Sequence, residues 1–151
     1  MSVRGPEDAV RAYVKLNRAT RAVLASVEGR VAGAGLTLTQ LGVLEAVLHK
    51  GPMTQRELGR KVLTSAGNMT DVLDKLARRG LIDRVKRDGR SVFVSLTETG
   101  RMLIADLFPR HANDIAAAFA SLSGAELAEL DRLLRKLGLA ASALEREADP
   151  D

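Results

Sequence analysis

Residues 66–79 carry the side chains best suited to reading the edge of a base pair. Apolar residues recur there at spacings of three and four, which is typical of one side of a helix: Met69, Val72, Leu73 and Leu76. The opposite side is polar and consists of Gly67, Thr70, Asp71, Asp74, Lys75 and Arg78, with Asn68 at its flank. Asparagine can form two hydrogen bonds with adenine, a threonine methyl can contact thymine, and glycine permits close approach of the backbone. The pattern predicts a helix that is presented to the major groove of DNA.

Two aspartates on this polar side are unfavourable beside phosphate. Asp71 stands four residues before Lys75, and Asp74 stands four residues before Arg78. This spacing favours ion pairs within the helix, each worth about 0.2–0.5 kcal/mol. The alternative is that one of the two aspartates binds Arg90 and orients it.

A second candidate DNA-contacting element follows the helix. The dipeptide Asp88-Gly89 separates residues 81–87 from residues 90–96, and an Asp-Gly pair between two such segments predicts a tight hairpin whose central residues have positive φ. Lys86, Arg87 and Arg90 lie around its tip. Arginine at a hairpin tip can enter the narrow minor groove. A basic hairpin that only aids solubility is the alternative.

The other elements are predicted from their ends. Three capping-box spacings mark helix starts: Thr37/Gln40, Thr54/Glu57 and Ser123/Glu126. They predict helices over about residues 38–49, 54–62 and 124–145. A first helix begins at Pro6 and runs to about residue 30, while Thr64 or Ser65 begins the helix over 66–79, which Gly80 ends.

A further helix is predicted from residue 98 to about residue 121. Pro109 lies inside it and predicts a kink or a division, because proline lacks the backbone N–H group that the helix needs. The acidic tail, residues 145–151, is expected to be frayed.

Together these elements predict a mainly α fold with a small β-hairpin: a winged helix-turn-helix. We expect a single domain over residues 1–151, with a DNA-binding lobe over about 37–97. The helices over about 6–30 and 98–145 carry apolar stripes that so small a core cannot cover, which predicts dimerisation through them.

Charge is concentrated in the middle of the chain. The net charge is +4, and residues 50–101 carry 12 basic and 6 acidic side chains, whereas residues 102–151 carry 5 basic and 9 acidic ones. Such a distribution suits a surface that neutralises phosphates, although a merely solvated charged surface explains it about as well.

The sequence contains little that indicates a catalytic site or a metal site. The chain has no cysteine, and its two histidines, His49 and His111, are far apart and lack a metal-ligand spacing. No nucleophile elbow and no phosphate-binding glycine loop occurs. We therefore predict no catalytic residue, no metal and no cofactor. The absence of a signal-peptide pattern and of an apolar run of about 20 residues predicts a cytoplasmic protein without a membrane segment.

The motifs resemble those of the MarR family of transcriptional regulators. The similarity extends over about residues 10–137 and depends on the order and spacing of residues 55–59, 68–76, 79–82, 88–90 and 94–100. It implies DNA contacts by Ser65, Asn68, Thr70 and Arg90. The hairpin is about two residues shorter than usual, and Gly89 stands where a second arginine is common, which reduces its reach.

We predict that DNA is contacted by Thr54, Thr64, Ser65, Gly67, Asn68, Thr70, Lys75, Arg78, Lys86, Arg87 and Arg90. The resemblance implies a homodimeric repressor on double-stranded DNA, with a pseudo-palindromic operator. Members of that family often bind a small aromatic or lipophilic acid as effector, and whether this chain does so is left open by the sequence. The candidate contacts are Tyr13, Asn17, Arg21, His49 and Met53, with ordinary core or surface placement as the alternative for each. The alternative function is a winged-helix protein-interaction module without DNA binding.

Overall fold

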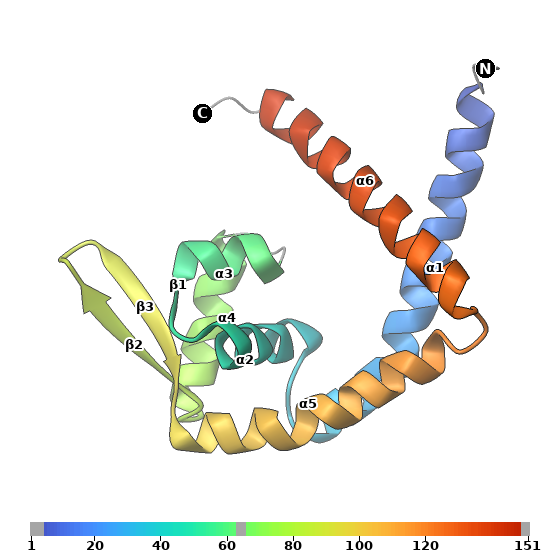
Figure 1. Ribbon diagram of the computed structural model, residues 1–151. Helices are drawn as coiled ribbons and strands as arrows, with labels where there is room; N and C mark the ends of the chain where they lie inside the picture. Colours follow the sequence, from blue (N-terminus) through green and yellow to red (C-terminus); the bar gives the residue numbers. More distant parts are fainter. Residues whose placement is uncertain (1–4, 63–65, 149–151) are drawn as a thin grey trace. The chain divides into compact units, whose positions relative to one another are not determined.

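The computed structural model describes residues 5–62 and 66–148 (Figure 1). Its elements are α1 (Pro6–Gly33), α2 (Leu38–Lys50), β1 (Met53–Thr54), α3 (Gln55–Val62), α4 (Ala66–Arg78), β2 (Ile82–Arg87), β3 (Ser91–Leu96), α5 (Glu98–Ala118) and α6 (Gly124–Ala148). The chain divides into two compact units, one up to Ile115 and one from Ala116 onward. The predicted fold class, mainly helical with a small β wing, is confirmed.

All three predicted capping boxes are present, and each satisfies two backbone donors at a helix start. The Gln40 N–H donates to Thr37 Oγ1 at 3.1 Å, and the Thr37 N–H donates to Gln40 Oε1 at 2.9 Å. Thr54/Glu57 and Ser123/Glu126 repeat this arrangement. The hydrogen bonds from Thr54 also lower the pKa of the Glu57 carboxyl, because they favour its ionised form.

One strand of the sheet, β1, was not predicted from the sequence. The sheet has three antiparallel strands in the order β1-β3-β2, where only the β2–β3 hairpin was predicted. Met53 pairs with Val94 and Thr54 with Phe93. A strand of two residues is too short to show the apolar alternation that identifies strands in sequence.

The hairpin turn has the backbone conformation that Asp-Gly predicts. Asp88 has φ 56° and Gly89 has φ 69°. The register pairs Arg87 with Ser91, so the turn contains three residues. Arg90 is the last of these, whereas the sequence predicted it as the first residue of the following strand. In Figure 1 the hairpin extends beyond the helices of the lobe.

The core lies among α2, α3, α4 and the sheet, with the end of α1 and the start of α5 packed against it. The predicted stripe of α4 is buried in it, with Leu73 and Leu76 each 0% exposed. Because this side of α4 is committed to the core, its polar side must face solvent.

The structure differs from the predictions at three places in the helices. Helix α5 runs unbroken through Pro109, so of the two predicted outcomes, a kink or a division, the division does not occur; a proline removes only a single N–H donor. Helix α6 continues to Ala148, so most of the tail that was predicted to be frayed is helical. Arg146 lies in its last turn, where a positive side chain interacts favourably with the negative end of the helix dipole. Helix α1 also ends later than predicted, at Gly33.

An ion pair joins α1 to α5. Arg30 Nε donates to Asp114 Oδ2 at 2.6 Å, and Arg30 Nη2 donates to Asp114 Oδ1 at 3.2 Å. The hydrogen bond with Arg30 lowers the pKa of the Asp114 carboxyl and raises the pKa of the Arg30 guanidinium. This contact connects helices that are separated by most of the chain.

Among residues 5–62 and 66–148, no single helix has the length and apolar character needed to cross a membrane. Helices α1 and α2 meet these criteria only in combination, and they are bent by 77° relative to each other.

Gly100 provides a test of this packing. The first turn of α5 lies against the turn between α4 and β2, because the Thr97 N–H donates to the Leu81 carbonyl at 3.1 Å. A Cβ at Gly100 would lie 1.9 Å from that Leu81 oxygen.

We expect Gly100→Ala to lower the free energy of unfolding, measured in urea, by about 2 kcal/mol or more. The matched control is Gly29→Ala, where a Cβ meets nothing within 4 Å and the higher helix propensity of alanine stabilises by up to ~1 kcal/mol. Equal effects of the two substitutions would contradict the packing described.

Candidate nucleic-acid interface

The polar side of α4 is solvent-exposed, as predicted. Asn68, Thr70, Lys75 and Arg78 are all exposed. Gly67 lies in the first turn of the helix, whereas Thr64 and Ser65 lie outside the described residues. Gln55 Nε2 donates to Thr70 Oγ1 at 2.9 Å and so connects α3 to this side of α4.

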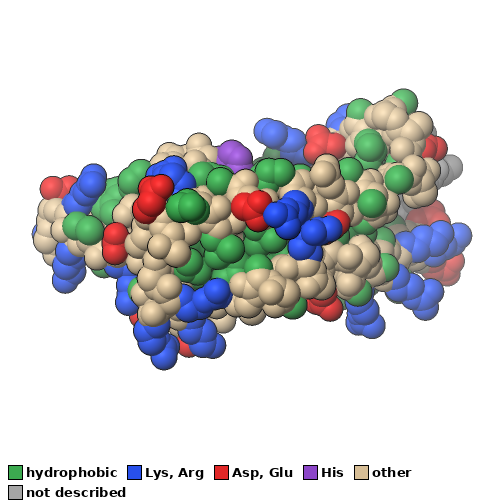
Figure 2. Space-filling model, turned by 90° about the horizontal axis from the view of Figure 1, so that it is seen from below, with side chains coloured by type: hydrophobic (Ala, Val, Ile, Leu, Met, Phe, Trp, Pro, Cys, Tyr) green, Lys and Arg blue, Asp and Glu red, His purple; other side chains and the backbone are tan. Residues whose placement is uncertain are grey.

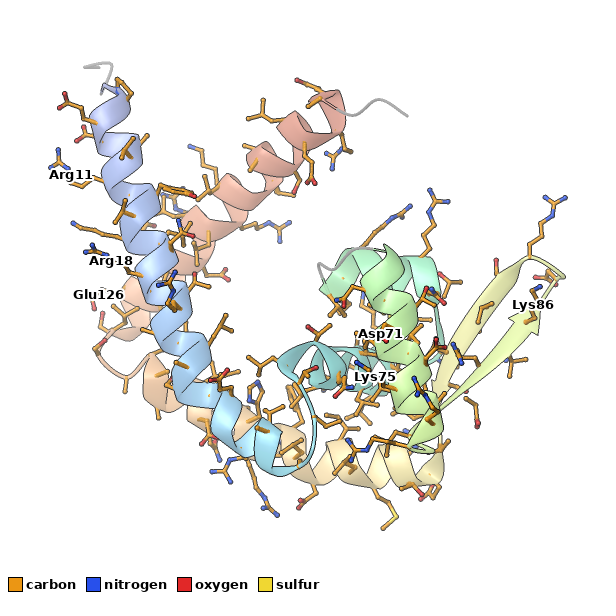
Figure 3. The ribbon with its side chains drawn as sticks, turned by 180° about the vertical axis from the view of Figure 1, so that it is seen from behind. Arg11, Arg18, Asp71, Lys75, Lys86 and Glu126 are labelled. Atoms are coloured by element: carbon orange, nitrogen blue, oxygen red, sulfur yellow. The ribbon has the colours of Figure 1, made fainter. Side chains whose placement is uncertain are left out.

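One of the two aspartates behaves as predicted. Asp71 Oδ2 lies 3.0 Å from Lys75 Nζ, and Figure 3 shows both residues projecting from the same side of α4. This pair reduces the negative charge that the exposed side of α4 presents.

The predicted ion-pair partner of Asp74 was wrong. Asp74 Oδ1 lies 2.5 Å from Arg84 Nη1 of β2. Arg78 Nε donates to the backbone carbonyl of Asp74 at 3.4 Å, and no ion pair joins its guanidinium to the Asp74 carboxylate in the described part of the chain. The alternative partner Arg90 is also incorrect. Arg84 follows the buried Ile82 by two residues and therefore shares its face of the strand, whereas Arg90 is in the turn at the tip. The carboxylate thus connects α4 to the wing through the wing's base.

The wing presents the three predicted cations in different settings. The Arg87 guanidinium lies 5.2 Å from the centre of the Phe93 ring, a cation–π contact along the strand pair. Lys86 lies near the tip (Figure 3), and it and Arg90 are exposed. Within the described chain, no ion pair is found for either of them.

A cleft of about 770 Å³ separates α3 and α4 from the wing. It is lined by Thr54, Gln55, Arg56, Gly59, Arg60, Met69, Arg90, Ser91 and Val92. Thr54 and Arg90 were predicted as DNA contacts from the sequence, whereas Arg56 and Arg60 were not. The missed signal was their spacing of four residues, which places both cations on one side of the short helix. Guanidinium groups pair well with phosphates, so three arginines around an open cleft have the chemistry to pair with an anionic chain such as a phosphodiester backbone.

Comparison with known proteins identifies the family. The MarR family model matches residues 34–91. The HTH-type transcriptional regulator MhqR of Bacillus subtilis is 33% identical over 135 residues, which cover 88% of this chain and 93% of MhqR. The chain belongs to the MarR family.

Solved structures agree with this assignment. The Bordetella bronchiseptica protein BpsR, whose DNA binding is regulated by 6-hydroxynicotinic acid, has a TM-score of 0.78 at 26% identity, covering 85% of this chain and 98% of BpsR. A mutant of MarR from E. coli, solved in complex with operator DNA, has a TM-score of 0.77 at 21% identity. The match covers 86% of this chain and 95% of the MarR chain, and at this level of identity it supports only the assignment of the fold. This MarR-family chain is thus a DNA-binding transcriptional regulator and not an enzyme.

The five candidate effector contacts are dispersed in this MarR-family structure. Tyr13, Asn17 and Arg21 are exposed on α1, and Met53 is buried in the core. His49 Nδ1 lies 2.9 Å from the Glu45 carbonyl oxygen, and its ring packs edge-on against Phe108 at 5.0 Å. A separate pocket of about 410 Å³ lies among α1, α2 and α3 and is lined by Leu24, Leu38, Thr39, Gly42, Glu45, Lys61 and Val62.

The Asp74–Arg84 contact predicts coupling between α4, the recognition helix of the helix-turn-helix, and the wing, which is the β2–β3 hairpin. We expect Asp74→Ala and Arg84→Ala each to weaken DNA binding several-fold, and the double variant to bind about as well as either single one, since exposed pairs contribute up to about 1 kcal/mol. The measurement is fluorescence anisotropy with the duplex that the wild-type protein enriches from its source genome. Asp71→Ala combined with Arg84→Ala is the control, and its effects should add. Additive effects for Asp74 and Arg84 as well would refute the coupling.

Proposed function

We propose that this protein is a homodimeric repressor that binds a pseudo-palindromic operator and releases it when a small molecule binds. The observation that carries the proposal is the three-arginine cleft beside the exposed polar side of α4. Regulation of DNA binding by a small acid in BpsR supports the release step.

The cleft suits the path of a DNA strand. A winged helix-turn-helix places its recognition helix in the major groove, and a basic wing tip suits the neighbouring minor groove. The phosphate backbone that separates the two grooves would then pass between α4 and the wing. Arg56, Arg60 and Arg90 line that space. Phosphate contacts of this kind fix the position of the protein, while Asn68 and Thr70 face the base edges.

Exposed apolar side chains support the dimer. In the first unit, the outer half of α1 exposes Val10, Tyr13, Val14 and Leu16. In the second unit, no residue of α6 is buried, and this helix exposes Leu127, Leu133, Leu134, Leu137, Leu139 and Leu144. Figure 2 shows that hydrophobic side chains also reach the surface on the face seen from below. Monomeric proteins rarely expose so much apolar surface, so we assign these helices to contacts between two subunits.

A symmetric dimer determines the form of the operator. Two identical recognition helices related by a two-fold axis read two inverted half-sites, whose centres lie about one helical turn of DNA apart. The pocket among α1, α2 and α3 is our candidate effector site. Its apolar wall of Leu24, Leu38 and Val62 with the cation Lys61 suits a small lipophilic acid, while the carboxylate that also lines it, Glu45, lies 3.1 Å from His49 Nδ1.

Salt dependence tests the DNA-binding proposal. We expect tight binding to selected genomic fragments, with an affinity that falls steeply as salt rises, by about 0.9 logarithmic units per phosphate contact for each tenfold rise in salt. Arg56→Ala, Arg60→Ala and Arg90→Ala should each reduce that slope by about one contact. Arg110→Ala, whose guanidinium pairs with Asp106 on α5, is the control and should leave the slope unchanged. Indifference to every fragment at low salt would instead favour the protein-interaction module.

Sedimentation velocity tests the dimer. We expect the double variant Leu134→Glu/Leu137→Glu to sediment as a monomer, because burying two carboxylates in an apolar contact is unfavourable. Ser142→Glu, on the exposed polar side of α6 that carries Asp131 and Arg135, should remain dimeric. A wild-type protein that is monomeric at micromolar concentration would refute the proposed assembly.

A further inference from the structure

One exposed guanidinium joins the ends of two helices that are far apart in sequence. Arg79, which directly follows α4, donates from Nη1 to the Gly35 carbonyl at 2.6 Å and from Nη2 to the Ala34 carbonyl at 3.3 Å. Ala34 and Gly35 form the turn that ends α1. All of these residues belong to the first compact unit. The contact is therefore a direct link between the recognition helix and α1.

Both helices end in the same backbone turn. After α1, the Gly35 N–H donates to the Ala32 carbonyl at 2.9 Å and the Leu36 N–H to the Val31 carbonyl at 3.1 Å. After α4, the N–H groups of residues 80 and 81 repeat these bonds to the carbonyls of residues 77 and 76. Such turns satisfy carbonyls of the last helical turn. The carbonyls of Ala34 and Gly35 lie beyond that turn, and Arg79 is their donor.

The electrostatics favour a cation at this place. The carbonyl end of a helix carries a partial negative charge, which stabilises a positive side chain nearby. The turn also has little room for change: Gly35 has φ +74°, and a Cβ built on it would lie 3.4 Å from Arg79 Nη1. On either side of the link, Leu36 and Leu81 are buried in the core. The two turns are thus anchored separately, and Arg79 bridges them at the surface.

We propose that Arg79 is a positioning residue that fixes α4 relative to the end of α1 and thereby sets the distance between the two recognition helices of the dimer. This inference rests on the proposed function, because α1 is assigned there to the dimer contact. A rotation or slide of α4 relative to α1 breaks both hydrogen bonds of Arg79. The protein therefore discriminates among operators by the spacing of their half-sites, through a residue that reads no base.

Spin labels measure this distance directly. The chain has no cysteine, so Lys75→Cys gives one label on each α4. Without DNA, we expect a narrow distribution of distances between the two labels in the parent, a clearly broader one with Arg79→Ala, and an intermediate one with Arg79→Lys, which retains one donor group. Arg110→Ala is the matched control and should leave the distribution narrow. An unchanged distribution with Arg79→Ala overturns the inference.

Operators of altered spacing provide the second measurement. The probes are the duplex that the wild-type protein selects from a randomised library and two derivatives with one base pair removed from or added to the segment between the half-sites. We expect wild-type binding to fall about tenfold on the altered duplexes and Arg79→Ala to reduce that preference several-fold with an unchanged salt slope. Equal weakening on all three duplexes overturns the inference: a smaller salt slope then identifies a phosphate contact, and a lower free energy of unfolding identifies a purely structural role.

Failure of the proposed function has a different signature. If the labelled parent shows no distance between subunits, the dimer is refuted and the inference falls with it. If the dimer distance is present but Arg79→Ala changes neither its width nor the spacing preference, the proposed function stands and only the role of Arg79 is refuted.

Discussion

Burial of one apolar stripe on α4 determines which side of this helix faces the solvent. Met69, Val72, Leu73 and Leu76 occupy the core, so rotating α4 about its axis would expose them at a cost of about 1.5–3 kcal/mol per side chain. The helix therefore has one orientation, and Asn68, Thr70, Lys75 and Arg78 must face outward. The neighbouring parts of the interface, the arginine cleft and the wing, are positioned relative to this helix.

The interactions around α4 form a set of links at its surface. Gln55 connects it to α3, the pair Asp74–Arg84 connects it to the base of the wing, and Arg79 connects it to the end of α1. Each link uses polar atoms at the surface, where a contact contributes little to stability but restricts geometry. The core therefore fixes which side of α4 is exposed, while the links fix where that side points.

Local features of this fold could be predicted from sequence because their determinants are local. Capping boxes at Thr37, Thr54 and Ser123 and the Asp88-Gly89 turn depend on residues at most three apart. The two-residue strand β1 could not be predicted, since it exists only by pairing with β3. The partner of Asp74 depends on strand register, and that of Arg79 lies more than 40 residues away. Arg56 and Arg60 were visible as charges, but only the folded chain places them opposite Arg90.

Chemical protection of a bound duplex tests most directly the claim that two copies of α4 enter the major groove. Dimethyl sulfate methylates guanine N7, which lies in that groove, and the probe is the duplex selected by the protein, with guanines placed throughout both half-sites. We expect two protected clusters whose centres lie about one helical turn apart, on one side of the DNA. Guanines that remain fully reactive in a saturated complex would contradict it.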